Sequence, residues 1–145
     1  MKHKSHFPGQ TIVEFALVIP VVLLLILGFF DLGRALINYS ALTNAVREGT
    51  RSGIVMAYDE AAIKDKVLEY AFTLTGTSNP LTADQIVPSI TSTDGFAESL
   101  QITATYCFVP VTPMIGTLIG SGCAGGGTGI ELTATSIMQY EPGAR

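Results

Sequence analysis

The N-terminal third of the chain carries one long apolar run between two carboxylates. No charged side chain occurs from Phe15 to Phe30, and Glu14 and Asp31 stand at the two ends of this stretch. The stretch alone is slightly shorter than the roughly 20 residues that a membrane-spanning helix needs, but adding residues 11–13 and Leu32 reaches that length. The pattern therefore predicts a single spanning helix with an ionisable residue near each end.

The helical pattern continues beyond the apolar run. Apolar side chains recur at spacings of three and four residues, which is typical of an amphipathic helix: Leu32, Leu36, Tyr39, Leu42 and Val46. Pro20 removes one backbone donor and is expected to kink the helix within the membrane. We expect one helix from about Thr11 to about Gly53, which is about twice as long as the bilayer core is thick. Its second half must therefore project into water and pack on the rest of the chain.

A second helix is predicted from Asp59 to about Phe72. Asp59 is a candidate N-cap, and Glu60 beside it suits the positive start of a helix. The expected apolar stripe comprises Ile63, Val67, Tyr70, Ala71 and Leu74. Residues 75–80 contain glycine, asparagine and proline and read as a loop.

The periodicity then changes to two, which predicts strands. Residues 86–91 form a weak strand that Pro88 confines to a sheet edge. Residues 99–109 and 130–140 alternate well, and a long loop with many glycines, residues 110–129, separates them. The expected inward faces are Leu100, Ile102, Ala104, Tyr106 and Phe108, and Ile130, Leu132, Ala134, Ser136, Met138 and Tyr140. The predicted fold is α+β: a long transmembrane helix continuing outside the membrane, a second helix, and a small antiparallel sheet packed on the long helix.

The ionisable residues argue against several functions. The two histidines, His3 and His6, both precede the apolar run, and the later residues assemble no nucleophile with a base, so we expect no enzyme. The part of the chain beyond Arg51 has three basic and nine acidic residues, a net charge of −6. Nucleic-acid binding needs a basic surface, so it is not expected. Gly125-Gly126-Gly127 lacks the lysine of a phosphate loop, and no cofactor is predicted.

Cys107 and Cys123 are the only two cysteines of the chain. Two cysteines outside the membrane usually pair, so an intramolecular disulfide is favoured. The alternative is a buried free thiol at Cys107 in its strand, with Cys123 an unused loop residue. A zinc site needs more ligands than two thiols, and no metal site is expected.

The start of the chain combines a basic leader with a glycine shortly before the apolar run. Lys2 and Lys4 lie in the leader, and Glu14 lies five positions after Gly9. A cleaved secretory signal is the rival interpretation, but the apolar core is long and no small-x-small site follows it closely. The arrangement resembles the class III signal of type IV pilin-like proteins, and more closely the TadE-like pseudopilins of tight adherence (Tad, Flp) pili. That resemblance implies cleavage between Gly9 and Gln10 and a role for Glu14 and Pro20 in assembly.

The segment from Arg47 to Arg51 is the second mark of the resemblance. TadE-like proteins carry an arginine-glutamate-glycine-small-arginine segment at this distance from the apolar run, and Arg47-Glu48-Gly49-Thr50-Arg51 matches it. The two arginines lie about one turn apart on a helix, with Glu48 beside them. Without the resemblance, a solvated helix patch that tolerates a glycine is an equally good interpretation. With it, contact of this segment with a partner subunit is expected.

The resemblance implies a minor pseudopilin that takes part in assembly of a Tad/Flp-type pilus. The expected parts are a leader (residues 1–9), a transmembrane and extracytoplasmic helix (10–55) and an extracytoplasmic α+β domain (56–145). Basic residues flank the span on both sides, so their count leaves the orientation open. The leader interpretation puts residues 1–9 in the cytoplasm and the rest outside a single-pass inner-membrane helix.

The implied partners are other pilin-like subunits, the prepilin peptidase, the inner-membrane assembly platform and membrane lipid. The chain's size argues for a minor role, because the major fibre subunits of the family are much shorter. Two alternatives stay open at this point. One is a bitopic membrane protein whose outer module binds an envelope partner without a filament, and the other is an anchored enzyme.

Overall fold

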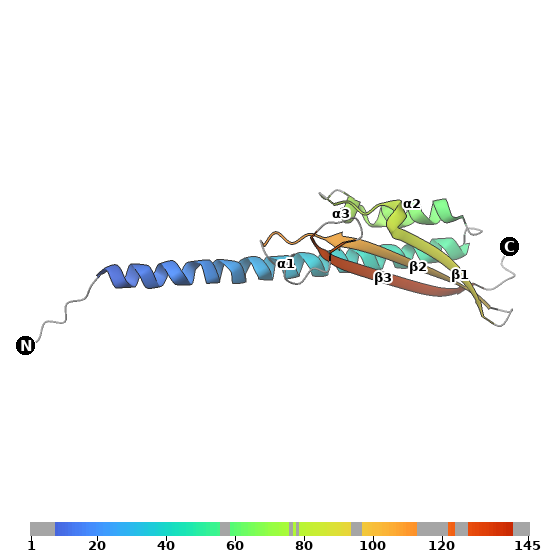
Figure 1. Cartoon of the computed structure of the whole chain (residues 1–145). Coiled ribbons are helices and arrows are strands. Elements are labelled where there is room, and N and C mark those ends of the chain that lie inside the picture. The colour runs from blue at the N-terminus through green and yellow to red at the C-terminus, as the bar shows by residue number, and fades with distance from the viewer. Residues whose placement is uncertain are drawn as a thin grey trace, which may run out of the picture.

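The computed structural model describes residues 8–55, 59–75, 77, 79–93, 97–112, 122–123 and 128–140. It shows a long helix whose C-terminal half lies against a sheet and two shorter helices, while its N-terminal half extends away from them (Figure 1). The part formed by residues 59–140 is called the head. Most of the expected leader, and residues 113–121 and 124–127 of the expected long loop, lie outside the described residues.

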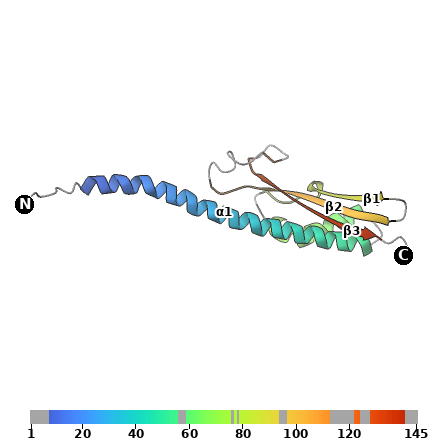
Figure 2. The same ribbon diagram turned by 90° about the horizontal axis from the view of Figure 1, so that it is seen from below.

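The long helix α1 spans Pro8–Val55, 48 residues, and passes through Pro20 without ending. At 1.5 Å per residue this is about 70 Å, so the prediction of one helix twice the bilayer thickness is confirmed. Figure 2 shows α1 as a gently curved rod; the kink expected at Pro20 stays a prediction. The apolar side chains of the first half are exposed, among them Leu17 (70%) and Phe29 (76%). Among the described residues, α1 is the one helix long and apolar enough to cross a membrane.

The sheet is antiparallel with the order β1-β2-β3. Its strands are β1 (Ile86–Thr93), β2 (Ala97–Phe108) and β3 (Ile130–Tyr140). Pro88 lies in the edge strand β1, opposite Ile102. Proline has no backbone N–H, and an edge strand tolerates this where that position faces solvent and not another strand. All three strands and the edge position of the first are confirmed.

The inward face of β2 forms the centre of the hydrophobic core. Each of its five expected side chains is at most 3% exposed, and alternate residues of β3 turn the same way, with Ala134 buried. The second half of α1 supplies Leu42, Ala45 and Val46, all fully buried. The apolar face of the sheet recurs every second residue and that of the helix every 3.6 residues, and each must be buried against another layer. The sheet therefore packs on the outer half of α1, as predicted.

Two helices follow α1, where one was expected. The Asp59 carboxylate caps α2 (Glu60–Tyr70) by accepting from the backbone N–H groups of Ala61 and Ala62. Ala71 is the C-cap of α2, and a single turn, α3 (Phe72–Thr75), carries the buried Leu74. The stripe is confirmed except at Tyr70, which is 48% exposed. Tyr70 is the last residue of α2, and a tyrosine can leave its polar end in water at little cost.

A short 3₁₀ helix, η1 (Ala83–Gln85), leads into β1 and was not predicted. Its capping box joins Thr82 and Gln85. This turn directs the chain from α3 to the outer edge of the sheet.

Candidate functional site

The N-terminal end of α1 carries the residues expected at the processing site. Gly9 and Gln10 lie in the first turn, both exposed, and a side chain at Gly9 would meet nothing within 4 Å. Glu14 lies one turn further on and is exposed, with no ion pair to another described residue. An isolated carboxylate on an apolar helix is favourable only if a headgroup or another chain compensates it. The described part of the chain therefore leaves Glu14 open to an external partner.

The segment from Arg47 to Arg51 is divided between surface and core. Arg47 and Arg51 are exposed, and Arg51 Nε lies 3.6 Å from Glu48 Oε1, a surface pair that contributes little to stability. Gly49 and Thr50 are buried, and the Thr50 hydroxyl donates to the Val46 carbonyl at 2.7 Å. The charged residues are thus available to a partner, whereas the glycine lies inside the chain's own core.

Gly49 allows α1 and α2 to approach closely. A β-carbon at Gly49 would overlap the Val67 Cγ2 methyl. One turn later, a β-carbon at Gly53 would lie 2.5 Å from Leu100 Cδ2 and 3.0 Å from Ile63 Cδ1. Both glycines therefore face the head, and a side chain at either position would push its neighbours away. The sequence interpretation considered only toleration or partner contact for Gly49 and did not recognise this packing.

Asp31 is a site residue that the sequence analysis noted only as the end of the apolar run. It is 4% exposed, although it is charged and lies on α1. Its carboxylate accepts hydrogen bonds from the backbone N–H groups of Val111 (2.9 Å) and Thr112 (2.8 Å). These donors follow β2 and are 80 and 81 positions away in the chain. Asp31 therefore fastens the membrane-proximal end of the sheet to α1.

Arg34 completes this junction. Its Nη1 lies 3.4 Å from Asp31 Oδ1, and its guanidinium lies over the Phe108 ring, 5.4 Å from the ring centroid. A cation over an aromatic face is attractive, more so when it is partly desolvated. The junction thus joins one helical turn of α1 to the last residue of β2.

The Asp31 carboxyl is stabilised in its charged form. Burial of a carboxylate costs free energy unless hydrogen bonds and an opposite charge compensate it. Here the backbone N–H groups of Val111 and Thr112 and the guanidinium of Arg34 do so.

Asp31→Ala is expected to loosen the junction and lower the free energy of unfolding of the head by on the order of 2 kcal/mol, because two backbone donors lose a charged acceptor. Hydrogen exchange at the Val111 and Thr112 amides should accelerate, and Asp31→Asn should lie between the two proteins. Asp65→Ala, which removes an exposed carboxylate, serves as the control. Unchanged exchange at both amides in Asp31→Ala would contradict the role assigned here.

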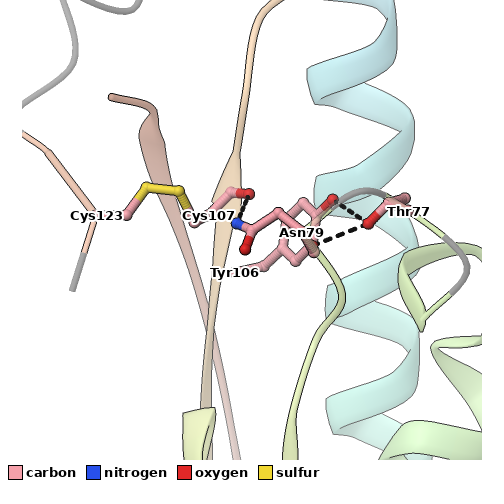
Figure 3. Close-up of a disulfide and its surroundings, with 5 residues drawn as sticks. All are labelled: Thr77, Asn79, Tyr106, Cys107 and Cys123. Carbon is pink, nitrogen blue, oxygen red and sulfur yellow. Dashed lines mark hydrogen bonds between the residues drawn. A yellow bond between two sulfur atoms is a disulfide. The ribbon is translucent and has the colours of Figure 1, made fainter. Parts of the chain in front are cut away.

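Cys107 and Cys123 form a disulfide with a Cα–Cα distance of 5.7 Å, which confirms the predicted pair (Figure 3). The bridge closes a loop of about 16 residues, for which the chain-entropy model gives about 3 kcal/mol. Gly129 is buried beside it, and a β-carbon there would lie 2.8 Å from Cys107 Sγ and 2.9 Å from Cys123 Sγ. The start of β3 therefore needs a glycine to pass the bridge.

The residues around the disulfide connect β2 to the segment after α3. Asn79 Nδ2 donates to the Cys107 carbonyl at 2.9 Å, and the Thr77 and Tyr106 hydroxyls are 3.2 Å apart (Figure 3). Thr77 and Asn79 are partly buried, and polar groups removed from water stabilise a fold when each finds a partner. This end of β2 is thus held by the disulfide on one side and by Asn79 and Thr77 on the other.

The described residues contain no group of three or more histidine, cysteine, aspartate or glutamate side chains that could hold a metal ion. The polar clusters around Asp31 and around the disulfide connect structural elements.

Comparison with protein families gives one match. Residues 9–51 match the family described as TadE-like protein. The chain is TadE-like over this segment. A search of curated proteins and a search of solved structures gave no match.

The TadE-like segment coincides with most of α1 and ends before the head begins. It contains Gly9, Glu14, the Asp31–Arg34 junction and the 47–51 segment. The sheet and the disulfide lie beyond it. The family thus describes the anchor and the helix surface on which the head packs.

Proposed function

We propose that this TadE-like protein is a membrane-anchored minor pseudopilin that takes part in assembly of a Tad/Flp-type pilus for surface adherence. The observation that carries the proposal is the family match over residues 9–51. The apolar, exposed first half of α1 supports it, because such a surface needs lipid or other apolar helices around it. We assign the chain no catalytic role.

In this proposal the chain has three parts: a leader (residues 1–9), the helix (10–55) and an outer domain (56–145). A prepilin-type peptidase removes the leader on the cytoplasmic side of the inner membrane. The outer domain then lies in an oxidising compartment, which suits the Cys107–Cys123 disulfide. The assembly platform in the same membrane receives the processed helix.

Glu14 is the residue to which we assign subunit selection. After cleavage it lies one helical turn from the new amine at Gln10, so it can pair with that amine or with the amine of a neighbouring subunit. Pairing between chains fixes the axial offset of two packed helices, since a shift by one turn separates the charges. Arg47 and Arg51, exposed on the outer half of α1, are the second proposed contact with a partner.

The alternative is a bitopic membrane protein whose outer domain binds an envelope partner without a filament. It shares the anchor and the orientation, and it differs in processing. A plain anchor keeps residues 1–9, whereas a pseudopilin loses them.

The mass of the intact protein isolated from membranes tests the proposal. The native protein should lack Met1 to Gly9 and begin at Gln10. Gly9→Val should retain the leader quantitatively, because the proposed peptidase requires a residue without a side chain before the cleavage site. Gly33→Val, in the same helix with nothing within 4 Å of its β-carbon, should be processed normally. A native protein that keeps its leader would remove the main support for the pseudopilin.

A further inference from the structure

An apolar groove lies where α1 meets the base of the head. Its volume is about 530 Å³. One wall consists of residues from α1 and the other of residues at the end of β2 and the start of β3. The residues that carry the argument are Leu24, Gly28, Leu32 and Ala35 on α1, and Phe108 and Ile130 on the head.

The groove crosses the expected surface of the membrane. Leu24 and Gly28 belong to the last turns of the uncharged stretch that ends at Phe30, so they lie at the depth of the outer-leaflet acyl chains. Ala35 lies on α1 beyond that stretch, and it lines the groove together with Phe108, the last residue of β2. The lower end of the groove is therefore continuous with the lipid-facing surface of α1, and its upper end reaches under the sheet.

The size of the groove favours a thin occupant over a helix. A helix with its side chains is 10–12 Å across, so two turns occupy on the order of 1,000 Å³, about twice the space present. A second copy's apolar helix could lie across the mouth of the groove but not inside it. A single hydrocarbon chain can enter from the leaflet without a change in the head.

The charges at the groove favour a neutral occupant. Asp31 is the one charged residue among the described residues that line it, and its carboxylate already accepts from Val111, Thr112 and Arg34. The negative phosphate of a headgroup would be repelled by that carboxylate, whereas a hydrocarbon chain is uncharged and needs no hydrogen bond from it. Leaving the apolar walls in water would cost about 25 cal/mol for each Å² exposed.

We propose that an acyl chain of an outer-leaflet phospholipid rises into this groove, so that the base of the head rests in the membrane surface and holds a lipid against α1. The inference rests on the anchoring and outward orientation of the proposed function. It assigns a binding site to the junction between the TadE-like helix and the head. The lipid would stiffen this junction beside the Asp31 bonds.

Photocrosslinking of the full chain in lipid nanodiscs tests the groove. One chain is placed in each disc, which excludes a second copy, and the phosphatidylcholine carries a diazirine midway along one acyl chain. Labelling of residues within the span is expected for any anchored helix. The expected distinguishing result is labelling of head peptides that contain Phe108 or Ile130. Labelling confined to residues 11–32 would overturn the proposal.

Ala35→Phe fills the groove and is expected to lower labelling of the head peptides about fivefold relative to the span, because an added ring displaces the guest. Ile37→Phe is the matched control, since Ile37 is 65% exposed and lies two positions on, on the other side of the helix. An intact Cys107–Cys123 disulfide shows that each variant has folded. Equal head labelling in folded Ala35→Phe and wild type would also overturn the proposal.

Neither readout needs leader cleavage or a pilus. Loss of head labelling with normal processing would therefore reject the lipid site and leave the proposed function standing. A retained leader with strong head labelling would reject the pseudopilin and leave the lipid site standing.

Discussion

Glu14→Ala is expected to abolish pilus assembly while membrane insertion stays intact. The carboxylate lies near the start of a strongly apolar helix, and removing it makes insertion more favourable, not less. Assembly, however, loses the charge that is proposed to pair with the amine of the next subunit. A packed apolar surface without such a pair has no strong preference among offsets that differ by one turn.

The measurement is the amount of sheared pilus material together with crosslinking of the protein to its neighbours in the membrane. Val13→Ala is the matched control, since Val13 is the adjacent residue and is also exposed, at 62%. It should assemble as the parent does. Glu14→Ala that assembles and crosslinks like the parent would remove Glu14 from the mechanism and favour a carboxylate that only reaches the headgroups.

Gly49→Ala is expected to destabilise the head by about 1–3 kcal/mol, the usual cost of overpacking a core. Its β-carbon would overlap the Val67 methyl, and a β-branched side chain on a helix cannot easily rotate away. This loss outweighs the gain of up to about 1 kcal/mol that replacing glycine by alanine brings in a helix interior. Urea unfolding of the full chain in detergent, followed by the fluorescence of its tyrosines, measures the change.

Two further variants isolate the cause. Gly33→Ala changes a glycine of the same helix with open space around it, so it should be neutral or slightly stabilising. Val67→Ala combined with Gly49→Ala should be less destabilised than the two single changes together, because the overlapping methyl is gone. Strictly additive losses would show that Gly49 does not act through Val67.

The partition between surface and core in the 47–51 segment bears on how TadE-like helices are interpreted. Glycine at position 49 suits the chain's own packing, whereas the arginines on either side remain exposed. Charge reversal at Arg47 or Arg51 therefore tests the proposed partner contact, and substitution of Gly49 tests the packing of the fold. Experiments that treat the segment as one unit would mix these two effects.

Local patterns in the sequence were enough to predict the elements and most of the faces. The uncharged run and the spacing of Leu42 and Val46 predicted one helix through and beyond the membrane, and strict alternation predicted the inward face of β2. These signals are strong because they depend only on the periodicity of each element and on which face must leave water. The pairing of Cys107 with Cys123 was predictable because the chain has no other cysteine.

Only the tertiary structure decided which residues meet across long separations. Asp31 is the end of an apolar run in the sequence, and it is a buried acceptor because a segment 80 residues later brings two backbone donors to it. Gly49 and Gly53 became close-packing positions because α2 and β2 approach α1 there. Tyr70 left the predicted stripe because α2 ends at that residue. Periodicity specifies the face that a residue occupies, whereas the distance between two faces depends on the volumes of all the side chains between them, which no local pattern contains.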